Sequence, residues 1–133
     1  GVMIEVNCET DFVSKGPKFK ELCRNLAMQV AASPTVEYVR FEDIPVDAIE
    51  KEREMEMKSE DLDGKPDNIK EKIVQGRVNK MFNEKVLLEQ DYIKDSKMTV
   101  DEFVKSYIAT LGENIQIKRF IKFELGDQED DDE

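Results

Sequence analysis

The chain has 133 residues, 39% of them hydrophobic, which is enough for one domain with one modest core. Its formal net charge of −11 repels phosphate backbones, so nucleic-acid binding is disfavoured and a protein partner is a better match. The absence of histidine removes Ser-His and Cys-His nucleophile pairs and the commonest metal ligand.

The first predicted element is a strand over residues 2–6, which are alternating and rich in β-branched side chains. The polar residues 7–11 follow as a turn. A helix is predicted to begin near Pro17, because proline is tolerated at the first helical position. Apolar side chains then recur at helical spacing over residues 19–30, which places Cys23 on a buried face.

The middle of the chain is predicted to be mainly helical. After a weak strand at residues 36–41, residues 46–62 form a helix whose dense charges we interpret as a solvated face. A longer helix follows over residues 66–88. Gly76 lies in its middle, where glycine costs about 1 kcal/mol relative to alanine, and this predicts a close backbone approach there.

The last part of the chain begins with a capping box, Thr99 and Glu102, which starts a helix that Gly112 ends. Residues 115–125 then alternate between apolar and polar side chains, as expected for a strand. Its apolar residues are predicted to share one face that only Arg119 interrupts: Ile115, Ile117, Ile121, Phe123 and Leu125.

Together these elements predict an α+β fold, in which a small antiparallel β-sheet packs against several helices. We expect residues 1–125 to form the domain and residues 126–133 to be a disordered acidic tail. No apolar run has the length of a membrane span and no targeting segment is present, so we expect no membrane association and a processed or excised chain.

Enzymatic chemistry would have to rely on carboxylates. Glu9 and Asp11 could form a general acid/base pair, but acidic residues in turns ordinarily hydrogen-bond the backbone. Cys8 and Cys23 lack metal-ligand spacing and are interpreted as buried or idle thiols in a reducing compartment. No glycine-rich phosphate loop follows a strand. We therefore expect no enzymatic activity, no nucleotide or other cofactor and no metal.

The unusual feature is Thr10-Asp11-Phe12-Val13, which puts a large aromatic residue in a turn between a strand and a helix. Phe12 could be a core residue that fixes the start of the helix. It could also be an exposed side chain that anchors a protein interface, as large aromatic residues often do. The residues alone favour the core interpretation.

The segment after the first strand closely resembles the signature of the elongation factor Ts family: Asn7-Cys8-Glu9-Thr10-Asp11-Phe12-Val13. The resemblance continues in order along nearly the whole chain, through residues 26–32, 73–78, 87–90, 111–115, 119–120 and 124–126. Residues 43–45 and 51–54 are more similar to the short cyanobacterial and plastid forms than to the long enterobacterial one.

The resemblance implies a guanine-nucleotide exchange factor that releases GDP from elongation factor Tu during translation elongation. In the family, the phenylalanine of the Thr-Asp-Phe motif inserts into the G domain of the partner. Carried over, Phe12 is the inserted residue, Asp11 is its polar neighbour, and Thr10 and Val13 support it. The usual N-terminal helical domain of the family and the strand before Gly1 are missing from the sequence.

The resemblance also carries expectations about assembly and location. Short forms are often homodimers with two sheets face to face, and plastid relatives occur near the ribosome, so both associations are expected here. The location it suggests is the chloroplast stroma or, alternatively, the bacterial cytoplasm.

Two competing hypotheses on function remain: a non-catalytic ribosome-associated module with the same fold, and a carboxylate enzyme.

Overall fold

The computed structural model of the protein describes residues 1–124, so the predicted acidic tail lies outside the described residues. The strands and helices follow one another in this order: β1 (Val2–Cys8), α1 (Asp11–Ser14), α2 (Pro17–Ala31), α3 (Val46–Met57), α4 (Asp67–Asn83), β2 (Asp91–Tyr92), β3 (Asp95–Thr99), α5 (Val100–Leu111) and β4 (Ile115–Lys122). Short 3-10 turns lie at Phe41–Asp43, Glu60–Leu62 and Leu87–Glu89. The predicted α+β class is confirmed.

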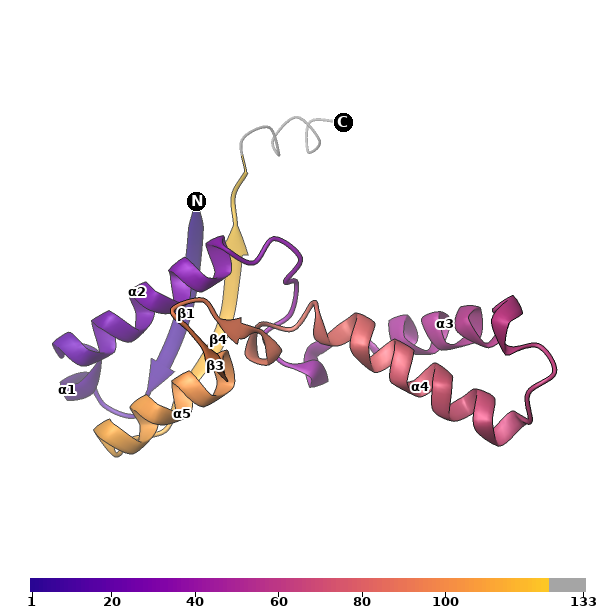
Figure 1. The fold of residues 1–133 in the computed structure, drawn as a ribbon. Helices are drawn as coiled ribbons and strands as arrows, with labels where there is room; N and C mark the ends of the chain where they lie inside the picture. Colours follow the sequence, from indigo (N-terminus) through magenta and orange to yellow (C-terminus); the bar gives the residue numbers. More distant parts are fainter. Residues whose placement is uncertain (125–133) are drawn as a thin grey trace.

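The described chain has two parts (Figure 1). In the first part, the antiparallel pair β1–β4 is covered by α2 and α5, and α1 lies at the end of β1. In the second part, α3 and α4 run side by side as a hairpin that projects away from the sheet. None of the described helices is both long and apolar enough to cross a membrane.

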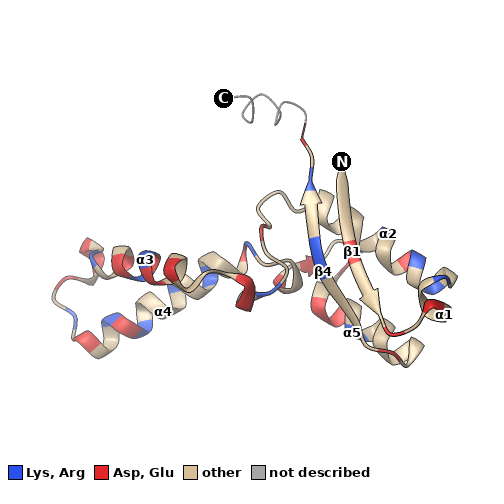
Figure 2. Cartoon of the chain, turned by 180° about the vertical axis from the view of Figure 1, so that it is seen from behind, with Lys and Arg blue, Asp and Glu red and all other residues tan. Residues whose placement is uncertain are grey.

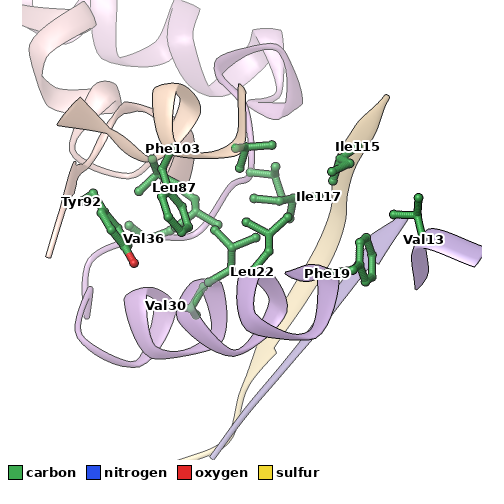
Figure 3. Close-up of a cluster of buried hydrophobic side chains, with 14 residues drawn as sticks. Val13, Phe19, Leu22, Val30, Val36, Leu87, Tyr92, Phe103, Ile115 and Ile117 are labelled. Atoms are coloured by element: carbon green, nitrogen blue, oxygen red, sulfur yellow. The ribbon is translucent and has the colours of Figure 1, made fainter. Parts of the chain in front are cut away.

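One apolar cluster holds the first part together (Figure 3). It joins the buried face of α2 to α5 and to the inner face of the sheet, and Tyr92 stacks on Phe103 with their ring centroids 4.0 Å apart. The helical spacing predicted for α2 is confirmed, since Leu22, Leu26 and Val30 are completely buried. This cluster fixes the end of β1 relative to α2 and α5.

A β-bulge in β4 changes which of its alternate residues face the core. Glu5 pairs with Arg119 but Val6 pairs with Ile117, which leaves Lys118 as an extra residue on β4. An extra residue reverses the alternation of side chains, because successive residues of a strand point to opposite faces. Before the bulge the odd-numbered residues, including the buried Ile117, face the core. Beyond the bulge the even-numbered residues do.

The single apolar face predicted for residues 115–125 is therefore wrong. Ile115 and Ile117 face the core, but beyond the bulge it is Phe120 that packs against the core. Ile121 and Phe123 are 47% and 54% exposed on the outer face of the sheet. Leu125 lies outside the described residues.

The helix ends in the hairpin differ from the prediction. The helix expected over 46–62 ends at Met57, and the helix expected over 66–88 ends at Asn83. The second end has a clear cause, because Gln90 Nε2 donates hydrogen bonds to the carbonyl oxygens of Asn83 (3.0 Å), Glu84 (3.2 Å) and Val86 (2.8 Å). This side chain satisfies carbonyl groups that a continuing helix would have bonded.

Two further predictions in this region are wrong. The weak strand at residues 36–41 is reduced to one isolated bridge between Tyr38 and Val86. Gly76 is not in close contact with other described residues, since a Cβ placed there would have no atom within 4 Å. The two hairpin helices instead close over a second apolar cluster that includes Leu62, Val74 and Val78.

By contrast, the capping box of Thr99 and Glu102 and the left-handed Gly112 after α5 are confirmed.

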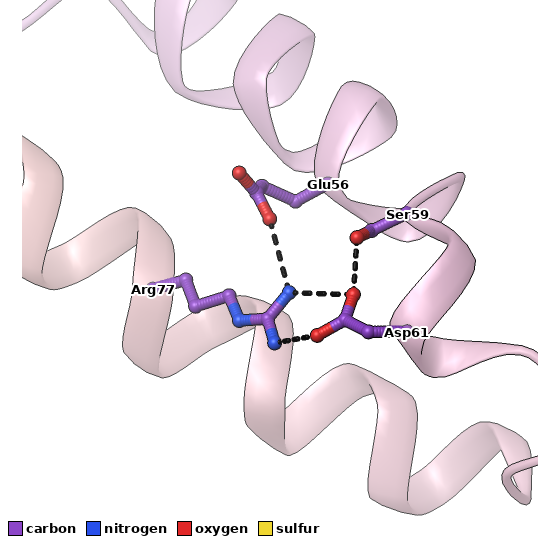
Figure 4. Close-up of polar contacts among 4 residues, drawn as sticks. All are labelled: Glu56, Ser59, Asp61 and Arg77. Atoms are coloured by element: carbon purple, nitrogen blue, oxygen red, sulfur yellow. Dashed lines mark hydrogen bonds and ion pairs between the residues drawn. The ribbon is translucent and has the colours of Figure 1, made fainter.

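A charged network joins the two helices of the hairpin (Figure 4). Arg77 of α4 donates hydrogen bonds to both carboxylate oxygens of Asp61 and, at 3.4 Å, to Glu56 of α3. Ser59 donates a further hydrogen bond to Asp61. The Arg77 guanidinium, with help from Ser59, holds the pKa of Asp61 well below its usual range.

Replacing Arg77 by methionine is expected to lower the urea midpoint of unfolding slightly at pH 7, because exposed ion pairs contribute little. A carboxylate with a lowered folded pKa stabilises the fold above its ordinary pKa of about 3.9, and this contribution is lost as the pH falls. The difference in urea midpoint between wild type and Arg77→Met should therefore become smaller as the pH is lowered from about 5. Arg53→Met is the control. The ion pair of Arg53 with Glu50 is 4.0 Å long and lies within α3, so it does not join the two helices. A difference that grows in acid would contradict this assignment.

Candidate functional site

The predicted site residues lie on a short turn that follows β1. Thr10 caps the four-residue helix α1, and its hydroxyl oxygen accepts a hydrogen bond from the Val13 N–H at 3.4 Å. Val13 points into the core with 8% of its surface exposed, whereas Phe12 is 89% exposed. Successive residues of a helical turn point in different directions, so burial of Val13 turns Phe12 outward. The interpretation of Phe12 as a core residue is wrong.

A carboxylate from the other end of the chain holds this turn. Glu113 Oε1 accepts hydrogen bonds from the N–H groups of Glu9 (3.2 Å) and Thr10 (3.0 Å). Its other oxygen, Oε2, accepts a hydrogen bond from the Thr10 hydroxyl at 2.6 Å. In return, the Asn114 N–H donates to Glu9 Oε1 at 2.8 Å. We call these four residues, Glu9, Thr10, Glu113 and Asn114, the clamp.

Local backbone conformation brings the two halves of the clamp together. Gly112 has φ 71°, a left-handed conformation that ends α5 and is readily adopted only by glycine. Glu113 and Asn114 follow directly and precede β4, whose first residue, Ile115, pairs with Cys8. The clamp therefore closes at the point where β1 and β4 meet, and it joins segments more than a hundred residues apart in the sequence.

Phe12 lies beside an apolar hollow of about 520 Å³. Its lining residues come from α1, the connection to α2, the start of α2 and the end of α5: Phe12, Val13, Lys15, Gly16, Pro17, Lys18, Phe19 and Leu111. The connection at Gly16 is tight, since a Cβ there would lie 3.2 Å from the Val13 carbonyl oxygen. An exposed aromatic side chain next to an apolar hollow is typical of a protein-binding surface.

Among the remaining candidate residues, Glu9 and Cys8 form hydrogen bonds within the fold, whereas Asp11 is exposed. The Glu9 carboxylate is engaged by the Asn114 N–H, as the backbone-bonding interpretation predicted, and Asp11 lies exposed in the first turn of α1. Cys8 Sγ donates a hydrogen bond to the Thr10 carbonyl oxygen at 3.3 Å, while burial raises the pKa of the half-buried Cys23 thiol. Among residues 1–124, no group of three or more acidic or cysteine side chains could hold a metal ion.

Sequence reasoning missed the role of Glu113 and Asn114. The run Leu111-Gly112-Glu113-Asn114-Ile115 contributed to the family resemblance, but no residue pattern links it to a turn at the opposite end of the chain. The link depends on the pairing of β1 with β4.

Comparison with known proteins gives a consistent result. A family model described as "Elongation factor TS" matches residues 1–127. The chain is 59% identical to the elongation factor Ts of Picosynechococcus sp. and 58% identical to that of Synechocystis sp.. It is 54% identical to a protein of Guillardia theta named "Elongation factor Ts, chloroplastic". Each of these three alignments covers 96% of this chain and 58% of the relative, so the chain spans little more than half of their length.

Proposed function

The chain belongs to the elongation factor Ts family, and from this premise we propose that it promotes the release of GDP from elongation factor Tu. The observation that supports the proposal most directly is the 89% exposed Phe12, on a turn held by the clamp. Thr10, Asp11, Phe12 and Val13 form the proposed contact with the G domain of the partner. As in the family, insertion of Phe12 would shift the partner's elements that hold magnesium and the nucleotide phosphates.

The proposed mechanism is one of linked equilibria. A protein that binds the nucleotide-free form of its partner more tightly must weaken nucleotide binding by the same factor. Burial of an exposed phenylalanine contributes about 1.5–3 kcal/mol, and this gain would be confined to the state that accommodates Phe12. Displacing magnesium would add to the effect, since the ion neutralises the phosphate charge. The proposal includes no covalent step, so the chain would promote exchange without making or breaking a covalent bond.

The direct test is GDP release. Elongation factor Tu loaded with fluorescent GDP is mixed with excess unlabelled GDP, with and without the chain. The proposal expects the release rate to rise with the concentration of the chain and then to saturate. An unchanged release rate, together with cosedimentation of the chain with ribosomes, would instead favour the non-catalytic ribosome-associated module.

We also propose the chloroplast stroma as the location, with the bacterial cytoplasm as the alternative. The support comes from the relatives, which include cyanobacterial proteins and one named as chloroplastic. Fractionation of intact plastids with an antibody to this chain would test the location.

A homodimer is a further part of the proposal, supported by the outer face of the β1–β4 sheet. Met3, Ile121 and Phe123 are exposed there, at 63%, 47% and 54%. Met3 pairs with Ile121 across the strands. The next pair along the same face, Glu5 and Arg119, carries opposite charges, and Figure 2 shows acidic and basic residues on β1 and β4. The self-complementary partner for such a face is the same face of a second copy, which would bury these side chains.

Replacing Phe123 by glutamate is expected to raise the dimer dissociation constant at least tenfold, because two added carboxylates would be buried near each other. Sedimentation equilibrium over a concentration series measures this constant. Met55→Glu is the matched control, since Met55 is 59% exposed on α3, away from the sheet. A wild-type chain that stays monomeric, or a Phe123→Glu variant that dimerises as wild type does, would overturn the dimer proposal.

A further inference from the structure

We propose that Glu113 is a positioning residue for nucleotide exchange, which sets the direction in which Phe12 projects. This inference rests on the proposed function, since it assigns a residue that acts through Phe12. Glu113 does not belong to the Thr10–Val13 turn and lies 103 positions after Thr10 in the sequence. It is the residue that joins this turn to the end of α5.

The hydrogen bonds form a continuous path from Glu113 to α1. The Thr10 hydroxyl donates its proton to Glu113 Oε2 at 2.6 Å, which leaves its oxygen lone pairs free to accept the Val13 N–H at 3.4 Å. The Thr10 and Glu9 N–H groups are held at the same time by Oε1. One carboxylate thus fixes both the backbone of the turn and the rotamer of its capping residue, and that cap fixes the start of the helical turn that carries Phe12.

The need for such a device follows from the exposure of Phe12. With 89% of its surface exposed, the side chain has little contact with the rest of the chain to set its direction. Val13, which is buried, anchors only one side of the turn. Orientation of an exposed anchor before binding removes part of the cost of ordering it in the complex. The clamp provides this orientation, since its hydrogen bonds hold the backbone of the turn and the Thr10 side chain in one geometry.

Three variants separate positioning from simple stabilisation. Glu113→Ala removes every acceptor and is expected to lower the saturated rate of GDP release about tenfold, with a smaller change in the half-saturating concentration. Glu113→Gln keeps an acceptor for the two N–H groups, and its amide can donate to the Thr10 hydroxyl, so it should recover activity to within about threefold of wild type. Thr99→Ala, which removes the cap of α5 away from the turn, should lose stability as cap removal does but stay within about twofold in activity.

The outcomes distinguish this inference from the proposed function. No acceleration by the wild-type chain overturns the proposed function, and the role of Glu113 in exchange with it. Acceleration that is lost in Phe12→Ala but unchanged in Glu113→Ala overturns only the positioning role. The same holds if Glu113→Gln is as slow as Glu113→Ala, because the negative charge rather than the geometry would then be needed. If Glu113→Ala does not fold, Thr10→Val removes the hydroxyl that bonds Glu113 and caps α1. This variant should accelerate GDP release several-fold less than wild type, and a wild-type rate of release would overturn the role of Glu113.

Discussion

The Phe12→Ala variant is expected to accelerate GDP release at least about 30-fold less than wild type, while its thermal unfolding stays unchanged. Truncation of an interface anchor costs about 2 kcal/mol or more, and each 1.4 kcal/mol corresponds to tenfold in an equilibrium constant. Stability should not change, since Phe12 is 89% exposed and contributes little to the core. Fluorescent-GDP release and circular dichroism measure the two effects on the same samples.

Met55→Ala is the control for this experiment. Met55 is also a large apolar side chain, 59% exposed, but it lies on α3 of the hairpin. We expect Met55→Ala to accelerate GDP release as much as wild type does. If Phe12→Ala accelerates release as well as Met55→Ala does, insertion of Phe12 is not the mechanism, even if the chain is an exchange factor.

The second large effect is expected for Leu22→Ala, which should destabilise the fold by about 2–5 kcal/mol. Leu22 is completely buried on α2, in the cluster that also holds Val13. Domains of this size are stable by only about 5–15 kcal/mol, so the loss is a large part of the total. Urea unfolding followed by circular dichroism should show a lower midpoint, and exchange activity should fall at temperatures where the variant unfolds.

Met28→Ala provides the comparison on the same helix, because Met28 is 45% exposed. Substitutions at such surface positions usually change stability by about 0.5 kcal/mol or less. Equal destabilisation by Leu22→Ala and Met28→Ala would mean that α2 does not pack on the sheet as described.

Local patterns predicted much of the first part of the molecule. The apolar spacing along residues 19–30 placed α2 and its buried face correctly, and the Thr99–Glu102 capping box placed the start of α5. These signals depend on neighbours within one helical turn, so they can be read from the chain without knowledge of the tertiary structure. The end of α4 was misplaced because Gln90, seven residues beyond Asn83, takes part in ending this helix.

The site was predictable only in part. The family resemblance indicated Thr10, Asp11, Phe12 and Val13, but the residues alone favoured a buried Phe12. Its exposure is decided by Val13, which takes the place in the core beside Phe19. The faces of β4 depend in the same way on the bulge opposite Glu5 and Val6, which no alternation within residues 115–125 could reveal.

The sequence by itself determined the α+β class, the helices α2 and α5 and the family, because these rest on short-range patterns and on motifs read in order. Only the tertiary structure decided that Phe12 points outward, that Ile121 and Phe123 lie on the outer face, and that Glu113 holds Thr10. The reason is physical. The direction of Phe12 depends on the packing of Val13 in the core, and the other two features depend on the meeting of β1 and β4, whose paired residues are more than a hundred positions apart in the sequence. Such contacts form only when the chain has folded.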